Sequence, residues 1–399
     1  MLKKLFVFTL ALVCVFPNAH AFTPIKMERI PTVFGELIKN NKLGNPAMVL
    51  IDLNSGQIVF SRDADGARKP ASTLKLISAM AVLDYLPAEK TFSTALFKTD
   101  LKNTFQIVGD FDPSITPSAR LARSDKFIWS GTLVSKIRAN AKSRALTVRY
   151  YGLTSRTRIN MSNEFRRIGY RITWRPITPE ETNRHLTDEI ATFTSPNLTK
   201  ILHHTLLWSD NFVADYLAFL AAKEAGYGFG ATGINPVFND VLARNLIDQP
   251  VIEVADGSGL SHINRLSART LALVLKKIYV DPKYKTVIDS LPVSGISGTL
   301  QNRYKTTSPH SVGLIRAKTG SLNGVVTLAG YIHSAENEYA FVILADRVGR
   351  YYAAESAARS AIDRLLGKLA APPLLKDGNG ETIGQDAPEA EVDLTPTNN

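Results

Sequence analysis

The stretch STLKLISAMAVLDYL, from Ser72 to Leu86, constrains the fold more than any other part of the sequence. It follows Pro70, has the pattern of a helix, and carries apolar side chains on nearly all of its sides. A helix without a polar face lies in the middle of a domain rather than on its surface. The rest of the chain must therefore surround it, and 399 residues with 45% hydrophobic and 21% charged residues suffice for one large globular domain with additions.

One charged residue interrupts this apolar stretch. Lys75 would cost several kcal/mol if it were buried and charged without a partner, so its place needs an explanation. The three-residue spacing puts Ser72 and Lys75 on one face at the start of the helix, where negative charge is favoured. Burial lowers the pKa of a lysine below about 10.4, and a neutral amine can act as a base toward the serine hydroxyl. Alternatively, Ser72 only caps the helix and Lys75 extends to water, because Ser-x-x-Lys alone also arises by chance.

A second polar feature, Lys318-Thr319-Gly320, occurs once in the sequence, at the end of a strand-like piece, LIRAKTG. A strand along a cleft can present Lys318 as an anion receptor and Thr319 as a hydroxyl donor, while Gly320 lets a substrate backbone approach closely. The alternative is an edge strand whose lysine prevents aggregation.

Three Ser-x-Asn sequences accompany these features, and their positions distinguish them. Ser195-Pro196-Asn197 is typical of a helix start, with serine as the cap and proline as the first helical residue. Ser321-Leu322-Asn323 follows the Lys-Thr-Gly sequence so closely that it belongs to the same turn. Ser209-Asp210-Asn211 separates two apolar helical stretches, LTKILHHTLLW and FVADYLAFLAA, so it occupies a loop that can reach into a cleft. We therefore select Ser209-Asp210-Asn211.

The chain resembles the penicillin-binding and serine β-lactamase superfamily through three motifs in order: Ser72-Thr73-Leu74-Lys75, Ser209-Asp210-Asn211 and Lys318-Thr319-Gly320. Further segments are similar to the D-alanyl-D-alanine carboxypeptidase/endopeptidase family called peptidase S13: Asp256-Gly257-Ser258-Gly259-Leu260-Ser261, Asn264-Arg265-Leu266-Ser267 and Gly295-Ile296-Ser297-Gly298-Thr299-Leu300. The resemblance covers roughly residues 45–92 and 190–350. Members of this family usually carry a longer insertion between the first two motifs, so an inserted subdomain is reduced or missing here.

The resemblance implies an α/β (α+β) fold, a β-lactamase/transpeptidase-like domain in which helices flank an antiparallel sheet. We expect this catalytic domain to comprise residues 22–92 and 184–370. Residues 93–183 form short strand-like pieces separated by basic loops, which predicts a smaller, β-rich inserted subdomain. Residues 371–399 contain one basic and six acidic residues and are expected to form a disordered tail.

The resemblance also implies roles for the motif residues. Ser72 would attack the carbonyl of the penultimate D-alanine, with Lys75 as its base, and form an acyl-enzyme that water hydrolyses. Ser209 would pass a proton to the leaving amine, and Asn211 would orient the substrate amide. The remaining assignments are the oxyanion hole, from the backbone N–H groups of Ser72 and Ser321, and the carboxylate site, from Lys318, Thr319 and Gly320. The partners implied are peptidoglycan stem peptides and β-lactam antibiotics as covalent inhibitors, with no nucleic acid.

Two other functions use the same residues. A β-lactamase is one, but the Glu-x-x-x-Asn element of class A enzymes is missing, since Glu253 is followed at the fourth position by Gly257. A catalytically silent cell-wall binding protein is the other, because fold does not fix function. We expect no cofactor and no metal, since the adjacent His203 and His204 of a helix point in different directions.

The N-terminus indicates export. Lys3 and Lys4 precede an apolar run and then Ala19-His20-Ala21, which predicts a secretory signal peptide over residues 1–21 and a periplasmic protein; the run is short for a membrane anchor. Cys14, the only cysteine, lies within this segment, so the mature chain has no disulfide. Residues 93–183 hold 16 basic and 7 acidic residues, which favours contact with an anionic envelope polymer or membrane surface, or equally a solvated basic face.

Overall fold

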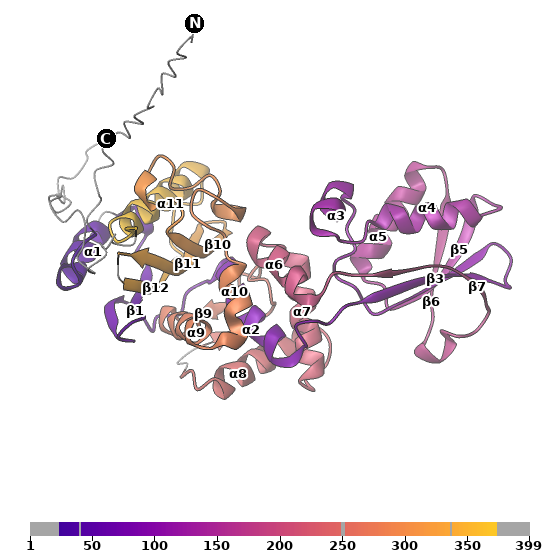
Figure 1. Ribbon diagram of the computed structural model, residues 1–399, viewed down its shortest axis with the longest axis horizontal. Helices are drawn as coiled ribbons and strands as arrows, with labels where there is room; N and C mark the ends of the chain where they lie inside the picture. Colours follow the sequence, from indigo (N-terminus) through magenta and orange to yellow (C-terminus); the bar gives the residue numbers. More distant parts are fainter. Residues whose placement is uncertain (1–23, 40, 249–251, 336, 373–399) are drawn as a thin grey trace, which may run out of the picture.

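The computed structural model describes residues 24–39, 41–248, 252–335 and 337–372. The predicted signal peptide lies outside the described residues, as does the predicted tail apart from its first two residues. The described chain forms two lobes, which Figure 1 shows side by side. None of its described helices combines the length and the hydrophobicity that a bilayer crossing requires.

The larger lobe is built on an antiparallel sheet of five strands, in the order β10-β11-β12-β1-β2. Its strands are β1 (Ala47–Asp52), β2 (Ile58–Arg62), β10 (Ile315–Leu322), β11 (Val325–Ser334) and β12 (Asn337–Ala345). The predicted hairpin of β1 and β2 and the predicted strands near the C-terminus are confirmed. The predicted fold class is confirmed as well, because helices cover both faces of this sheet.

The alternation of side chains along the strands divides the core of this lobe into two clusters. Met48 and Leu50 of β1 pack in a cluster with helices α1 (Ile30–Lys39) and α11 (Tyr352–Gly367). Ala47, Val49 and Ile51 point to the opposite face, toward the other helices of the lobe. These helices are α2 (Lys75–Tyr85), α6 (Leu198–Trp208), α7 (Asn211–Glu224), α8 (Ile234–Arg244), α9 (Ala268–Val280) and α10 (Lys285–Asp289). A two-stranded sheet of β8 (Ile252–Glu253) and β9 (Arg265–Leu266) completes the lobe.

Helix α2 is the buried helix expected from the sequence, and residues 75–82 of it are all buried. Its start differs from the prediction, because residues Ala71–Leu74 form a separate 3-10 turn in which Ser72 lies. The predicted start of α6 is also wrong. Asn197, and not Ser195, caps this helix by accepting a hydrogen bond from Lys200 N, while Ser195 Oγ accepts one from Phe92 N.

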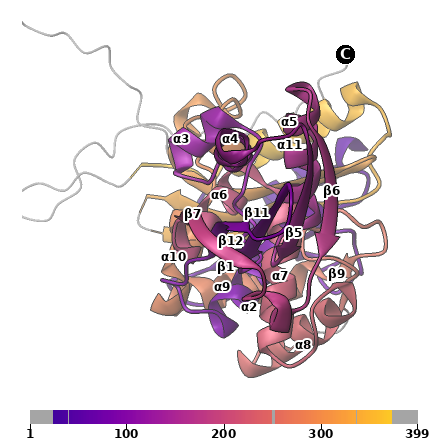
Figure 2. The same ribbon diagram turned by 90° about the vertical axis from the view of Figure 1, so that its right-hand side faces the viewer.

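The smaller lobe is the insertion, seen end-on in Figure 2. Its mixed sheet has the order β6-β5-β4-β3-β7 and comprises β3 (Ser93–Thr99), β4 (Thr104–Gly109), β5 (Ala145–Tyr151), β6 (Arg171–Pro176) and β7 (Leu186–Thr194). The pairs β4–β5 and β5–β6 are parallel, so they need crossover helices, α4 (Ser130–Asn140) and α5 (Ser155–Arg167). A short helix, α3 (Ala119–Asp125), precedes α4. The predicted boundary at residue 183 falls short of β7, because β7 pairs with β3 and belongs to this sheet.

Candidate active site

The Lys75 amine is buried at the start of α2 and makes three polar contacts. Its Nζ lies 2.9 Å from Ser72 Oγ, 2.7 Å from Asn211 Oδ1 and 2.7 Å from the backbone oxygen of Ser258. Burial lowers the pKa of Lys75 to about 8, although the carboxylates of nearby aspartates oppose this shift. A neutral amine has two N–H groups and one lone pair. Donation to Asn211 and Ser258 leaves the lone pair for the Ser72 hydroxyl, which is the arrangement of a base and a nucleophile.

The Ser-Asp-Asn sequence occupies the tight connection between α6 and α7. Ser209 ends α6 with φ 62°, a left-handed conformation that is uncommon for residues other than glycine. Asp210 caps α7 by accepting a hydrogen bond from Val213 N at 3.0 Å. Asn211 is the first residue of α7, and its amide oxygen accepts the hydrogen bond from Lys75. This connection therefore brings Ser209 and Asn211 to the Ser72–Lys75 pair.

The Lys-Thr-Gly sequence lies on β10, an edge strand that runs beside the Ser72 turn. A Cβ atom on Gly320 would come within 3.0 Å of Ser72 N and would clash with the Thr327 hydroxyl. Gly320 is thus required for the close approach of β10 to the Ser72 turn, which corrects the predicted reason, approach of a substrate backbone. Thr319 Oγ1 donates to Thr299 Oγ1 at 2.8 Å.

Lys318 lies where its predicted role does not fit. Its side chain is fully buried, and its Nζ donates to the backbone oxygen of Thr319 at 3.0 Å. Burial, and secondarily the charge of Lys75, lower the pKa of Lys318 well below its usual value. A carboxylate receptor must face the pocket and carry charge, and this buried amine is not part of the pocket lining.

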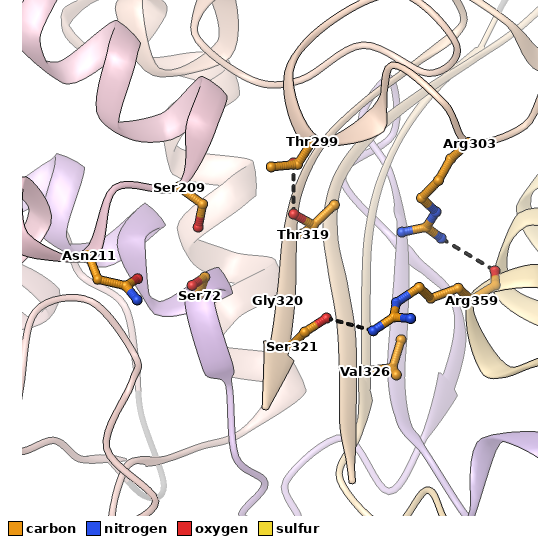
Figure 3. A pocket seen from close by; sticks show the side chains of 10 residues that line it. All are labelled: Ser72, Ser209, Asn211, Thr299, Arg303, Thr319, Gly320, Ser321, Val326 and Arg359. Atoms are coloured by element: carbon orange, nitrogen blue, oxygen red, sulfur yellow. Dashed lines mark hydrogen bonds between the residues drawn. The ribbon is translucent and has the colours of Figure 1, made fainter. Parts of the chain in front are cut away.

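A cavity of about 340 Å³ opens between these segments, as Figure 3 shows. It is lined by Ser72, Ser209, Asn211, Thr299, Arg303, Thr319, Gly320, Ser321, Val326 and Arg359. Six of the eight predicted site residues are in this list; Lys75 and Lys318 are buried behind it.

Two arginines of the pocket were not expected from the sequence. Arg359 of α11 donates to Ser321 Oγ at 3.3 Å and to Glu355 at 3.0 Å. Arg303 pairs with the buried Asp363 through Nε and Nη2. Both guanidinium groups point toward the β10 side of the pocket (Figure 3). Arg303 follows the Gly295–Leu300 segment closely, whereas nothing in the sequence distinguishes Arg359 from an ordinary arginine on a surface helix.

These residues define a class of protein. A serine hydroxyl beside a buried amine of lowered pKa, with a second serine, an amide and two arginines in one pocket, is a serine acyl-transfer site of the Ser-Lys kind. In the described part of the chain, no three His, Cys, Asp or Glu side chains are grouped so that they could hold a metal ion.

Comparison with known proteins gives the family. The model of the D-Ala-D-Ala carboxypeptidase 3 (S13) family matches residues 35–142 and 136–369, and the chain belongs to this family. The chain is 35% identical over 161 residues to a D-alanyl-D-alanine carboxypeptidase of Actinomadura sp. strain R39, covering 39% of this chain and 29% of that protein. It is 29% identical over 183 residues to the D-alanyl-D-alanine carboxypeptidase DacB of Haemophilus influenzae, covering 45% of this chain and 37% of that protein. The matches thus span about a third of the length of these relatives.

Solved structures show the same fold over most of the chain. The crystal structure of penicillin binding protein 4 from Haemophilus influenzae aligns with a TM-score of 0.64 at 17% identity, covering 82% of this chain and 98% of that one. A predatory peptidoglycan endopeptidase from Bdellovibrio bacteriovorus aligns with a TM-score of 0.59 at 17% identity, covering 83% and 94%.

Proposed function

We propose that this protein is a serine-type D-Ala-D-Ala carboxypeptidase or endopeptidase that hydrolyses peptidoglycan stem peptides through an acyl-enzyme on Ser72. The observation that carries the proposal is the buried Lys75 amine, 2.9 Å from the Ser72 hydroxyl, beside a pocket that also contains Ser209 and Asn211. Relatives described as D-alanyl-D-alanine carboxypeptidases, and a structural neighbour described as a peptidoglycan endopeptidase, support the same activity.

The reaction uses only groups of the chain, the substrate and water. Ser72 Oγ attacks the carbonyl carbon of the penultimate D-alanine, and its proton passes to the lone pair of Lys75. Backbone N–H groups of Ser72 and Ser321 stabilise the negative charge on the carbonyl oxygen. The C–N bond then breaks, Ser209 delivers a proton to the leaving amine, and water hydrolyses the ester on Ser72. Asn211 holds the substrate amide and keeps the Lys75 amine in place.

The carboxylate of the terminal D-alanine needs a receptor beyond the scissile bond. We assign it to Thr319 and Arg359, with Arg303 beside them, instead of the buried Lys318. A guanidinium keeps its charge at every physiological pH and offers several N–H donors to a carboxylate. The carboxylate of a penicillin would occupy the same place.

Covalent labelling by a fluorescent penicillin tests the nucleophile. Structural neighbours include one complexed with a β-lactam and one acylated by penicillin G, so we expect this protein to be labelled as well. Ser72→Ala should abolish labelling while the circular dichroism spectrum and the thermal unfolding remain those of the wild type. Undiminished labelling of Ser72→Ala would show that another group is the nucleophile.

Product analysis separates the remaining alternatives. Incubation with defined muropeptide monomers and dimers, followed by mass spectrometry, distinguishes loss of a terminal D-alanine from opening of a cross-bridge. A benzylpenicillin complex that lasts for minutes supports a penicillin-binding enzyme. Rapid turnover of the antibiotic would instead identify a β-lactamase, and no reaction with either compound would favour a silent binding protein.

We also propose a periplasmic location, which rests on the predicted signal peptide, and contact of the insertion with an anionic envelope polymer. A groove of about 470 Å³ between α3 and β7 supports this contact, because its lining includes Arg123, Lys126, Trp129 and Phe193. Cations attract an anionic chain, and the aromatic rings offer apolar surface for sugar rings. Lys126→Glu should weaken sedimentation of Ser72→Ala protein with purified peptidoglycan and leave penicillin labelling of the single Lys126→Glu variant unchanged.

A further inference from the structure

The insertion reaches directly to the middle residue of the Ser-Asp-Asn connection. Arg156 of α5 points to the Asp210 carboxylate, with Nη1 at 3.3 Å from Oδ1 and 3.4 Å from Oδ2. Its guanidinium also lies 4.8 Å from the centre of the Phe212 ring. Both side chains of this ion pair are mostly shielded from solvent, with 33% and 18% of their surfaces exposed. Partial burial makes such an ion pair stronger than one on an open surface, where salt and water weaken it.

A second contact reaches the same carboxylate through a buried histidine. His204 of α6 is only 6% exposed, and its Nε2 lies 3.9 Å from Asp210 Oδ2. Its Nδ1 lies 2.6 Å from the carboxylate of Asp125, the last residue of α3. The Phe127 ring packs edge-on against the imidazole, with ring centres 4.9 Å apart. Asp125 and Phe127 belong to the insertion, so α3 fixes the imidazole that faces Asp210.

The position of Asp210 matters because its neighbours belong to the pocket. Asp210 caps α7, and the residues on either side of it, Ser209 and Asn211, line the cavity beside Ser72. Ser209 has a left-handed backbone conformation, which costs energy and persists only where the surroundings fix it. A shift of Asp210 would therefore move the Ser209 hydroxyl and the Asn211 amide together.

We propose that the inserted subdomain positions the catalytic connection, with Arg156 as the principal positioning residue and the Asp125–His204 pair as a second support, both acting through Asp210. The inference rests on the proposed function, since acylation of Ser72 is its main readout. Arg156 contacts neither Ser72 nor Lys75, so its effect must pass through the placement of Ser209 and Asn211.

The test compares three variants in the full chain. The rate constant of acylation and the dissociation constant of the preceding complex are measured separately with a fluorescent penicillin. Arg156→Ala should lower the acylation rate constant by about tenfold to a hundredfold, the range expected when reacting groups are displaced by about an ångström. Arg156→Lys keeps the charge opposite Asp210 and should restore most of the rate. The dissociation constant should change much less than the rate constant in both variants.

Arg158→Ala is the matched control. Arg158 lies on the same helix and is half-buried like Arg156, but its guanidinium lies 4.8 Å from the Tyr150 ring centre and makes no described contact with Asp210. It should therefore acylate at the wild-type rate. The proposal is overturned if Arg156→Ala acylates normally, or if Arg158→Ala loses as much rate, because a general loss of charge or stability would then explain the effect. A wild-type protein that is not acylated at all would instead contradict the proposed function.

Hydrogen exchange gives a readout that does not need activity. The Val213 amide donates to Asp210, so exchange of this amide reports whether the connection is held. Arg156→Ala should speed exchange in residues 209–213, and Arg158→Ala should not. Unchanged exchange in Arg156→Ala would show that Asp210 keeps its place without the insertion.

Discussion

At the scale of single residues, the amine of Lys75 determines how the site should respond to pH. Burial lowers the pKa of this lysine to about 8, so its neutral, basic form becomes the major form only above that pH. We predict that the rate of acylation by benzylpenicillin rises between about pH 6 and pH 10, with its midpoint near the pKa of Lys75. Stopped-flow measurement of acylation across this range checks the prediction. A rate that stays constant or falls through the midpoint would exclude Lys75 as the base.

Arg359 carries a second prediction at this scale. Loss of a charged hydrogen bond typically costs about 1.5–3 kcal/mol, so Arg359→Gln should lower kcat/KM for an acyl-D-Ala-D-Ala peptide by roughly tenfold to a hundredfold. The same peptide with a C-terminal amide lacks the carboxylate and should be hydrolysed about equally by both proteins. Arg364→Gln, an exposed position on the same helix, is the control and should leave both substrates unaffected. Equal losses on the acid and the amide would contradict a carboxylate role.

The sequence identified the residues of the site better than it identified their directions. Each motif contains its reactive groups at fixed positions, so Ser72, Lys75 and Asn211 could be selected from the order of the motifs alone. Directions depend on strand register. Successive residues of a strand point to opposite sides, so β10 turns Gly320 toward the Ser72 turn and also buries Lys318, while Thr319 and Ser321 line the pocket.

At the scale of elements, local sequence signals predicted the strands and buried helices of the larger lobe but not how the insertion is built. Apolar runs flanked by turn residues defined the strands of the main sheet, because both faces of that sheet are covered. Helices α4 and α5 were missed, since they are short of apolar residues and pack only one side against the smaller sheet. The cap of α6 was misplaced because serine and asparagine are nearly equal as caps, and pairing of Ser195 with Phe92 decided between them.

The loop that holds Gly259 carries a prediction about the Ser72 turn. Gly259 has φ +82°, and a Cβ atom there would clash with the backbone oxygen of Ala71 and lie 3.1 Å from Ser72 N. Gly259→Ala should therefore displace the Ser72 turn and abolish penicillin labelling. Gly226→Ala is the control, because Gly226 has φ +85° but nothing within 4 Å of the added atom. Both variants should lose about 1–2 kcal/mol of stability from the left-handed backbone, and only Gly259→Ala should lose labelling. Normal labelling of Gly259→Ala would show that the turn can yield.

At the scale of the whole molecule, the two lobes have largely separate cores. One cluster of buried side chains lies entirely within residues 96–193. To the cores of the larger lobe the insertion contributes one buried side chain, Phe127, and two partly buried ones, Phe111 and Leu121. The lobes are thus joined less by apolar packing than by polar contacts at the Ser-Asp-Asn connection. This arrangement allows the larger lobe to fold alone and still depend on the insertion for the placement of its catalytic groups.

Removal of the insertion separates these two dependences. Strands β3 and β7 are antiparallel neighbours in which Ala95 pairs with Thr192, so an Asn-Gly turn can join these residues and replace everything between them. We predict that this shortened protein unfolds cooperatively, at a lower temperature because the packing of Phe127 is lost, and that a penicillin acylates it at least as slowly as Arg156→Ala. Calorimetry and the acylation rate constant check the two parts. A folded product that acylates at the wild-type rate would mean that the larger lobe positions Asp210 unaided, whereas an insoluble product would mean that the lobes fold as one unit.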